Sequence, residues 1–533
     1  MCGIFAFINN RSISTNLKKQ LYKSAMKCKH RGPDNTHEML IDKIYLVFHR
    51  LIINDTSTSG DQPMTHPNDR DIILLCNGEI FNSHELKKHY DIKTQSDSDC
   101  EIILHLYKLF GMKKTISSLD GDFAFILIDR TESVVYVGRD PIGVRPVYIG
   151  MSNNNIGIAS EVKSLSEMFI DIKQIDPGTF TTINFSIPLN EMLETTYYNY
   201  EYPIKFETDY YPLIRNLLTT AVEKRLMSDR PIGCLLSGGF DSSLIAGLLS
   251  KYYKPYELHT FSIGLAGSED LKYAKIVADH LNTIHHEYVV SEEEMLDAIA
   301  NVIILIESYD TTTVRASVPM YLMARRIKKE TDITVLFSGE GADEASGSYL
   351  YFRNAPDDYK RQEEIIRLMK DLSYFDVLRA DKTISGAGLE LRVPFLDKDF
   401  LAHYLAIPPN LKRTDSSRIE KHLLRSAFSL EKIIPNSVLW RRKEAFSDGV
   451  SSEKKSWFSI IQDHVEEIVL NDKMESASER FTFNTPRTKE EYYYRDIYDR
   501  VYPGRDKDIP YFWMPTWTKA TDPSARTLDV YKN

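Results

Sequence analysis

The chain is poor in cysteine and has no long hydrophobic run. Its cysteines are odd in number, widely spaced and form no metal-ligand pattern; they are residues 2, 28, 76, 100 and 234. This usage favours reduced thiols over a disulfide framework or a zinc site. No apolar run reaches transmembrane length, and the first residues lack the basic region of a signal peptide. We therefore expect a cytoplasmic protein that does not act in a membrane.

An excess of basic residues is also absent. Acidic residues outnumber basic ones by 76 to 66, which gives a net charge of -10. This balance argues against nucleic acid as the main partner. The hydrophobic share of 42% and the charged share of 27% are typical of a globular protein. A length of 533 residues is enough for two or three domains.

The first part of the chain, to about residue 185, is rich in short strand patterns. We expect strands at Gly3–Ile8, Tyr45–Arg50, Ile72–Cys76, Phe123–Asp129, Val134–Gly138 and Pro146–Ile149. Helical patterns lie between them at Leu17–Cys28, Ser83–His89 and Asp99–Phe110. Many strands with few helices predict an α+β domain of layered antiparallel sheets covered by helices.

The second part alternates strand and helix patterns. A polar and aromatic stretch from Asn184 to Tyr211 shows no clear period, so we place the linker there. The predicted domains are residues 2–187 and 209–533. Expected strands are 232–236, 258–263, 286–290 and 333–337; expected helices are 211–227, 242–251, 269–281, 292–307 and 316–329. This order predicts an α/β domain with a parallel sheet, followed by further helices.

A glycine-rich turn follows the first strand of the second domain. The string Ser-Gly-Gly-Phe-Asp-Ser-Ser occupies residues 237–243, between an apolar run and a helix start. Gly238 and Gly239 let backbone N–H groups approach a phosphate, and the helix dipole favours an anion. No Gly-Lys-Ser/Thr follows, so this is not a Walker loop. The string resembles the pyrophosphate loop of ATP pyrophosphatases, and that resemblance predicts nucleotide binding at Ser237, Gly238, Gly239, Asp241 and Ser242.

A second glycine-rich turn, Ser338 to Glu344, is acidic. Acidic groups beside a phosphate loop are repulsive unless Mg²⁺ lies between them, so we predict Asp241 and Asp343 as magnesium ligands. The basic string at 440–443 offers Lys443 or Arg441 to leaving pyrophosphate. A solvated acidic turn and an ordinary basic helix end are the alternatives.

Cys2 directly follows the initiator Met. We expect Met1 to be removed, which places a thiol and an α-amine on one residue; the thiol is the nucleophile and the amine takes its proton. Asn77 and Gly78 can donate to a tetrahedral oxyanion. Further residues can bind the α-carboxylate and α-ammonium groups of an amino-acid substrate. Arg50 can bind the α-carboxylate, and Glu79 and Asp99 can bind the α-ammonium. The alternative for Cys2 is a buried cysteine of a first strand.

Together with His30–Asp34, His49–Leu51 and Gly138–Pro146, these strings resemble class II glutamine amidotransferases, which are N-terminal-nucleophile hydrolases. The resemblance implies Cys2 as nucleophile, with Asn77 and Gly78 as oxyanion hole. It implies glutamine contacts at Arg50, Leu51, Ile52, Ile53, Asn54, Asn77, Gly78, Glu79 and Asp99. Asn54 departs from the aliphatic residue usual at its position.

Over nearly the whole chain, the motifs resemble the glutamine-hydrolysing asparagine synthetase family. The stretches 308–317 and 521–528 are particularly similar to the animal type of that family. The resemblance implies that aspartate is activated by Mg²⁺-ATP as β-aspartyl-AMP, and that ammonia from glutamine then displaces AMP. It implies ATP contacts at Leu235, Ile263, Ser338 and Gly339, a role for Glu340 in forming the adenylate, and a homodimer. We expect a protected ammonia channel.

Two further departures from the family lie near the predicted ATP site: Phe240 inside the phosphate loop, and Ser348 where glycine is frequent. We expect repacking around Phe240 and an altered turn at Ser348. Two rival functions stay open. One is adenylation of another carboxylate, as in β-lactam-forming relatives, which usually lack the N-terminal cysteine. The other is a non-catalytic protein that keeps the fold.

Overall fold

A computed structural model describes residues 1–152, 154–186, 192–415, 418–442, 446–452, 455–524 and 527–528. The chain forms two compact units. Unit 1 comprises Met1–Tyr200, Met227–Pro231 and Ser385–Glu390, and unit 2 comprises Glu201–Leu226, Ile232–Ile384 and Leu391–Asn533. Two short segments from later in the chain therefore complete unit 1. Each unit is described by itself.

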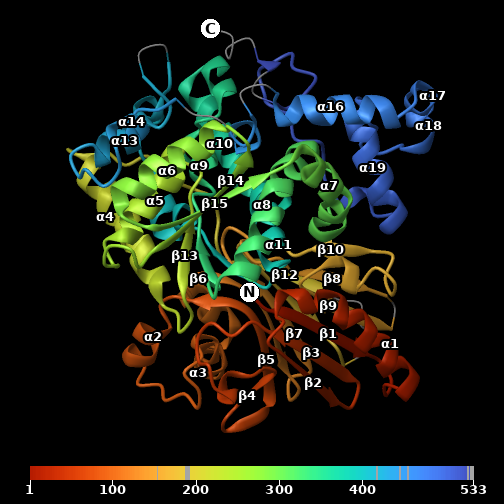
Figure 1. The fold of residues 1–533 in the computed structure, drawn as a ribbon. Coiled ribbons are helices and arrows are strands. Elements are labelled where there is room, and N and C mark those ends of the chain that lie inside the picture. The colour runs from red at the N-terminus through yellow and green to blue at the C-terminus, as the bar shows by residue number, and fades with distance from the viewer. Residues whose placement is uncertain are drawn as a thin grey trace. The chain divides into compact units, whose positions relative to one another are not determined.

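Unit 1 contains two six-stranded sheets whose assigned pairings are antiparallel (Figure 1). In spatial order, the first consists of β10 (Ile172–Gln174), β8 (Tyr148–Met151), β9 (Asn155–Ala159), β1 (Gly3–Asn9), β3 (Ile44–Arg50) and β2 (Asn35–Ile41). The second consists of β12 (Met192–Thr196), β11 (Thr179–Asn184), β7 (Val134–Arg139), β6 (Gly121–Asp129), β5 (Asp69–Ile80) and β4 (Met64–His66).

Alternation along the strands of unit 1 builds three hydrophobic layers. Ile4, Ala6 and Ile8 of β1 share a core with strands of both sheets, including Ile73 and Ile126. The intervening residues of β1 pack on α1 (Thr15–Ala25), and the opposite face of β5 packs on α3 (Ile102–Ser118). Successive strand side chains point to opposite faces, so strands buried on both faces are hydrophobic throughout. The unit is a helix–sheet–sheet–helix stack with a further short helix, α2 (Ser83–His89).

Unit 2 is built around a five-stranded sheet. Its spatial order is β15 (Ile284–Val290), β14 (His259–Leu265), β13 (Ile232–Leu235), β16 (Val335–Phe337) and β17 (Glu390–Arg392). The pairs β14–β15, β13–β14 and β13–β16 are parallel. Cys234 of β13 lies opposite Phe337 of β16, so both strands end at the same edge of the sheet. Ligands of open parallel sheets bind at this edge.

Helices flank the sheet of unit 2 and continue to the C-terminal region. The long helices near the sheet are α4 (Tyr210–Glu223), α5 (Phe240–Ser250), α6 (Glu269–Leu281), α7 (Glu292–Ile306) and α8 (Thr311–Glu330). The later ones are α9 (Ala342–Ser346), α10 (Asp358–Asp371), α11 (Asp376–Ser385), α12 (Lys398–Tyr404), α13 (His422–Phe428), α14 (Asn436–Leu439), α15 (Phe446–Gly449), α16 (Trp457–Ile468), α17 (Asn471–Glu475), α18 (Ala477–Arg480) and α19 (Lys489–Val501).

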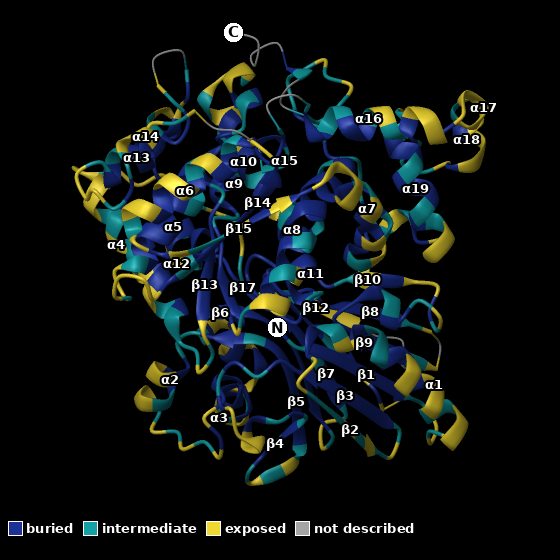
Figure 2. Ribbon diagram, viewed as in Figure 1, coloured by how far each residue is buried: buried dark blue, intermediate teal, exposed yellow. Residues whose placement is uncertain are grey.

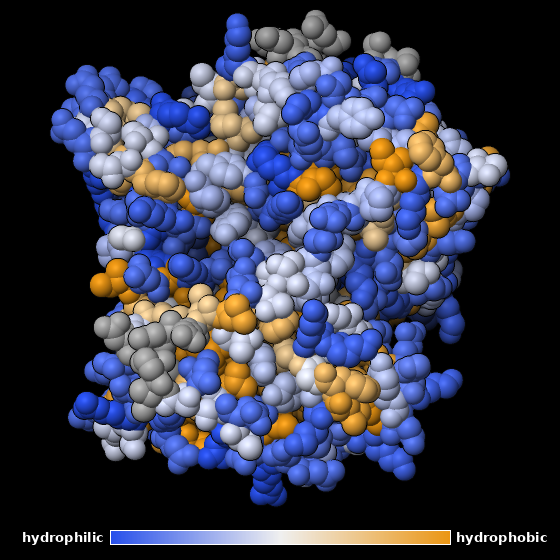
Figure 3. Space-filling view, turned by 180° about the vertical axis from the view of Figure 1, so that it is seen from behind, coloured by the Kyte–Doolittle hydropathy of each residue, from blue (hydrophilic) through white to orange (hydrophobic). Residues whose placement is uncertain are grey.

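Burial follows this arrangement. In Figure 2 the strands are mostly buried, and exposed residues gather on helices such as α1, α2 and α17. The face in Figure 3 is mainly hydrophilic, with hydrophobic side chains in separate groups. Within the described residues, no helix is both long and apolar enough to cross a membrane.

The structure confirms the predicted fold classes: antiparallel sheets with helices in unit 1, and a parallel sheet with helices in unit 2. The stretch from Asn184 to Tyr211, where we place the linker, contains a strand that the sequence pattern does not predict: Met192–Thr196 forms edge strand β12. This strand is largely exposed, so it lacks the hydrophobic alternation that marks a half-buried strand.

Candidate active sites

Cys2 lies beside the end of β3 in unit 1. The Leu51 N–H points to Cys2 Sγ at 3.5 Å, and Arg31 Nε donates to the Cys2 carbonyl at 3.1 Å. Burial raises the pKa of the Cys2 thiol. The nearby N-terminal amine and the Leu51 N–H act in the opposite direction and reduce this increase. With Met1 present, the chain's terminal ammonium donates to buried Glu390 Oε2 at 2.8 Å. The Cys2 nitrogen is then an amide, so it has no free lone pair for base catalysis.

Asn77 and Gly78 of β5 lie next to this thiol. The Cys2 N–H donates to Asn77 Oδ1 at 2.7 Å, while no described residue accepts from the buried Asn77 Nδ2. A buried donor left without an acceptor is costly, which suggests that a ligand supplies one. Gly78 has a φ of 152°, and a Cβ there would lie 2.2 Å from the Asp122 carbonyl oxygen. Only glycine fits this position.

Glu79 and Asp99 converge on one nitrogen. The side-chain amide of Asn54 donates to Glu79 Oε2 and, at 3.3 Å, to Asp99 Oδ1. Asp99 Oδ2 accepts the Ile80 N–H at 2.6 Å. Both carboxylates are at most 5% exposed, and burial raises the pKa of Asp99. The structure thus brings together the two acids predicted to bind an α-ammonium.

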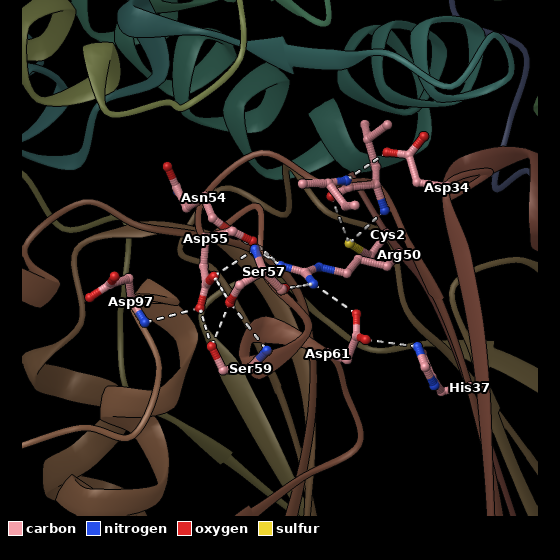
Figure 4. A network of polar contacts seen from close by, with 12 residues as sticks. Cys2, Asp34, His37, Arg50, Asn54, Asp55, Ser57, Ser59, Asp61 and Asp97 are labelled. Atoms are coloured by element: carbon pink, nitrogen blue, oxygen red, sulfur yellow. Dashed lines mark hydrogen bonds and ion pairs between the residues drawn. The ribbon is translucent and has the colours of Figure 1, made fainter.

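Arg50 is held by the loop that follows it (Figure 4). Nη1 donates at 2.7 Å to both the Ser57 carbonyl and Asp61 Oδ1, and Nη2 donates to the carbonyls of Asn54 and Asp55. Backbone groups fix the same loop: Ile52 N–H reaches Asp34 Oδ2 at 2.9 Å. The predicted carboxylate clamp is therefore already engaged, through both terminal nitrogens, in shaping the loop from 51 to 61.

In unit 2, the two glycine-rich turns meet. They follow β13 and β16, and a Cβ on Gly339 would lie 2.8 Å from Ser242 N and 2.9 Å from Asp241 C. Glycine at 339 lets the second turn lie directly against the first. Around Gly239, by contrast, a Cβ would meet only Ser237 Oγ, at 3.4 Å. The first turn is therefore open where a phosphate would approach.

A cavity lies at this junction. The predicted ATP, magnesium and adenylation residues that line it are Leu235, Ser237, Gly239, Asp241, Ser242, Ile263, Ser338, Gly339, Glu340 and Asp343. Gly238 does not line it, but its carbonyl accepts from Arg441 Nη1 at 3.3 Å. Lys443 lies outside the described residues. Phe240 is 5% exposed and lines the cavity, and the Arg425 guanidinium lies 4.6 Å from its ring centre.

Asp241 and Asp343 also converge on one nitrogen. The Lys421 ammonium donates to Asp241 Oδ2 and to Asp343 Oδ1. Burial alone would lower the pKa of Lys421, but these two carboxylates raise it. Ser348 Oγ donates to Asp343 Oδ1 at 2.5 Å. The described residues contain no group of three or more His, Cys, Asp or Glu side chains that could hold a metal, but these two acids already share one cation.

Glu340 faces a second cation. Arg379 of α11 donates to its two oxygens, at 3.1 and 2.7 Å, and to Asp376 Oδ1 at 3.0 Å. Burial raises the pKa of Glu340 against the effect of Arg379. Next to it, burial raises the pKa of Glu344 well above its ordinary value, with Tyr349 donating to that carboxyl. The cavity therefore contains both a fixed ion pair and a carboxyl group whose pKa burial raises.

Sequence reasoning missed Lys421, Arg379, Arg425 and Tyr349 of this cavity. Lys421 and Arg425 are separated by one helical turn, but no glycine-rich turn or strand end marks them. Arg379 lies three residues before Lys382, a second basic residue of α11 that does not line this cavity. Lys382 is instead buried on Glu307. Only the fold brings these cations to the ends of β13 and β16.

Comparisons with known proteins match both parts of the chain. A glutamine amidotransferase domain model matches residues 1–199, and an asparagine synthase model matches 213–368 and 353–525. These matches define an amidotransferase joined to a synthetase. Glutamine-hydrolysing asparagine synthetases of Bos taurus and Homo sapiens are each 44% identical, and that of Gallus gallus 42%, over 100% of this chain and 99% of theirs. The chain therefore belongs to the glutamine-hydrolysing asparagine synthetase family.

Proposed function

We propose that the chain makes asparagine from aspartate and ATP, with ammonia that it releases from glutamine. The observation that carries this proposal is the cavity of unit 2, where two glycine-rich turns place Asp241, Asp343 and Glu340 around one space. Unit 1 supports the other half, because Cys2 lies beside a buried amide donor, Asn77 Nδ2. The names of the relatives give asparagine as the product and glutamine as the compound hydrolysed; aspartate and ATP are the further substrates in this proposal.

Glutamine hydrolysis starts at Cys2. With Met1 removed, the α-amine accepts the thiol proton, and Sγ attacks the amide carbon of glutamine. Asn77 Nδ2 and the Gly78 N–H stabilise the oxyanion. The C–N bond breaks, ammonia leaves with the transferred proton, and water hydrolyses the thioester to glutamate. Glu79 and Asp99 bind the α-ammonium group. Arg50 contributes to binding of the α-carboxylate in two ways. Its Nε, from which no described residue accepts a hydrogen bond, donates to the carboxylate. Its terminal nitrogens hold the loop that contains residues 51–54.

Aspartate is activated in unit 2. Its β-carboxylate oxygen attacks the α-phosphorus of ATP, pyrophosphate leaves, and ammonia then displaces AMP from β-aspartyl-AMP. The 237–242 turn binds the pyrophosphate, with Arg441 and Lys443 as cations for the leaving group. Leu235, Ile263, Ser338 and Gly339 bind the adenosine part. Glu340, held by Arg379, supports formation of the adenylate.

Mg²⁺ is the cofactor in this proposal, with Asp241 and Asp343 as its ligands. Their fit is supported by Lys421, since both carboxylates already accept hydrogen bonds from one cation. Bound there, Mg²⁺ supplies neutralisation of phosphate charge. We further propose domains at 2–187 and 209–533 and a homodimer, on the basis of the family motifs. The few, unpaired cysteines support a cytoplasmic location.

Two variants test the proposal. Cys2→Ala should abolish glutamine-dependent synthesis and leave ammonia-dependent synthesis near the unaltered rate, since only the first site loses its nucleophile. Asp241→Asn should reduce pyrophosphate release by roughly 1,000-fold while glutamine hydrolysis continues. Asparagine, pyrophosphate and glutamate are measured in each case. Loss of both activities in Cys2→Ala, or pyrophosphate release with another acid but not aspartate, would contradict the proposal.

A further inference from the structure

The side chain of Asn54 occupies the acid pair of unit 1. It lies in the loop after β3 and is labelled in Figure 4. Its amide nitrogen donates to both Glu79 and Asp99. The Ile80 N–H donates to Asp99 Oδ2, and Asn54 donates to the other oxygen, Oδ1. A ligand that binds between the two acids must therefore share or take the position of this amide.

We propose that Asn54 is an internal competitor for the α-ammonium group of glutamine, and that residue 54 thereby sets glutamine affinity. The inference rests on the proposed glutaminase function, in which Glu79 and Asp99 bind that group. An ammonium carries a full charge and three N–H donors, whereas the amide offers a neutral dipole. The substrate therefore displaces the amide, at the expense of part of its binding free energy.

The loop permits this exchange without moving its backbone. The residues on both sides of Asn54 are bound to Asp229: the Ile53 carbonyl accepts the Asp229 N–H at 2.9 Å, and the Asp55 N–H donates to Asp229 Oδ2 at 2.9 Å. Arg50 holds the remainder of the loop through Ser57 and other groups. The Asn54 side chain is only half-buried, so rotation about its own bonds is enough to release the acids.

Asn54→Leu tests the inference, because leucine keeps the shape and removes the amide. Two ligands are compared on the full chain: glutamine, through its KM for hydrolysis, and glutaramate, which lacks the α-amino group, through its inhibition constant. We expect the KM for glutamine to fall roughly ten-fold with little change in kcat. The inhibition constant for glutaramate should change less than about two-fold, since that ligand does not compete with Asn54.

An equal change for both ligands would overturn the inference, because it would indicate a general effect on the pocket. So would an unchanged KM for glutamine, which would mean that Asn54 does not affect binding, and so would a higher KM, which would make Asn54 a substrate contact. Ser59→Ala is the matched control: this exposed loop residue bonds Asp55 Oδ2 at 3.2 Å, and its change should leave both constants unaltered. Absence of glutamine hydrolysis in the unaltered chain would instead overturn the proposed function itself, before any variant is compared.

Discussion

Each unit places two carboxylates around one nitrogen of its own chain, but the two nitrogens differ in charge. In unit 1 the bridge between Glu79 and Asp99 is the neutral Asn54 amide; in unit 2 the bridge between Asp241 and Asp343 is the Lys421 ammonium. A neutral donor brings no positive charge of its own to the acid pair. An ammonium compensates part of the pair's negative charge.

The difference suits the ligands we propose. A singly charged α-ammonium can displace an amide, whereas a lysine held by two acids yields only to a stronger cation or remains beside the phosphates as a second positive charge. It follows that polar donors in unit 1 should matter mainly for catalysis and binding. The charged donor in unit 2 should also matter for folding.

The largest effect in this comparison is expected for Asn77→Ala. Removal of one oxyanion donor should lower kcat for glutamine hydrolysis by about 100- to 1,000-fold, or about 3–4 kcal/mol in transition-state stabilisation. Stability should fall only by about 1 kcal/mol, because Asn77 Oδ1 accepts one hydrogen bond from the Cys2 N–H while no described residue accepts from Nδ2. Steady-state kinetics and thermal unfolding check the two statements. A large loss of stability with unchanged kcat would assign Asn77 to the core instead.

Lys421→Met should show the opposite pattern. It leaves two carboxylates facing each other, so the free energy of unfolding should fall by about 2–3 kcal/mol; the loss is below that of a fully buried pair because the acids are 22% and 24% exposed. Mg²⁺ should restore more stability to this variant than to the unaltered chain. Thermal unfolding with and without Mg²⁺ measures this, and equal Mg²⁺ effects on both proteins would contradict a shared cation position.

Lys412 provides a comparison with Lys421, because it is also a buried lysine but donates to neutral oxygens instead of carboxylates. The difference between the two shows how the carboxylates affect a buried ammonium. Its ammonium donates to Gln362 Oε1 at 3.0 Å and to main-chain carbonyls, and burial lowers its pKa to about 7, with Arg361 adding to the effect. Because the folded-state pKa is below the unfolded value, the unfolded chain binds more protons between pH 7 and 10, and stability rises with pH there.

Lys412→Met removes this pH dependence. Relative to the unaltered chain, the variant should gain about 2 kcal/mol as the pH falls from 9 to 6, because only the unaltered chain must then accommodate a buried charge. Chemical unfolding at the two pH values measures the change. A pH-independent difference would show that the ammonium stays charged, as it does in Lys421.

The sequence predicts the strands and turns of both sites because their signals are local. Apolar runs ending in glycine-rich turns mark β13 and β16 and therefore the cavity edge. Cations that reach this edge from later helices, such as Lys421 and Arg379, have no local signal, because only tertiary packing decides which basic residue is buried. The same limit applies to Lys382, which the fold pairs with Glu307 instead.

In unit 1, local patterns predict Asn77, Gly78, Glu79 and Asp99 as site residues. They do not predict which groups of the protein itself contact these residues. The motif assigns Arg50 to a substrate, while the structure engages both its terminal nitrogens in the loop. Edge strand β12 is missed for a related reason, since an exposed strand owes its place to backbone pairing with β11 rather than to its side chains. Residues that depart from the family pattern, Asn54 and Ser348, prove to contact predicted ligand-binding acids.

Ser348 offers the smallest and most direct contrast with Asn54. Its hydroxyl donates at 2.5 Å to Asp343 Oδ1, one of the oxygens that Lys421 also contacts. Unlike the Asn54 amide, it touches only one acid, so it fixes the orientation of that carboxylate without filling the space between the pair. Ser348→Ala should therefore weaken Mg²⁺ binding and raise the half-saturating Mg²⁺ concentration for pyrophosphate release by up to about ten-fold, whereas Asn54→Leu strengthens glutamine binding. The measurement is pyrophosphate release titrated with Mg²⁺ at fixed ATP. Tighter Mg²⁺ binding in Ser348→Ala would make this hydroxyl a competitor too, and the two sites would then differ in charge alone.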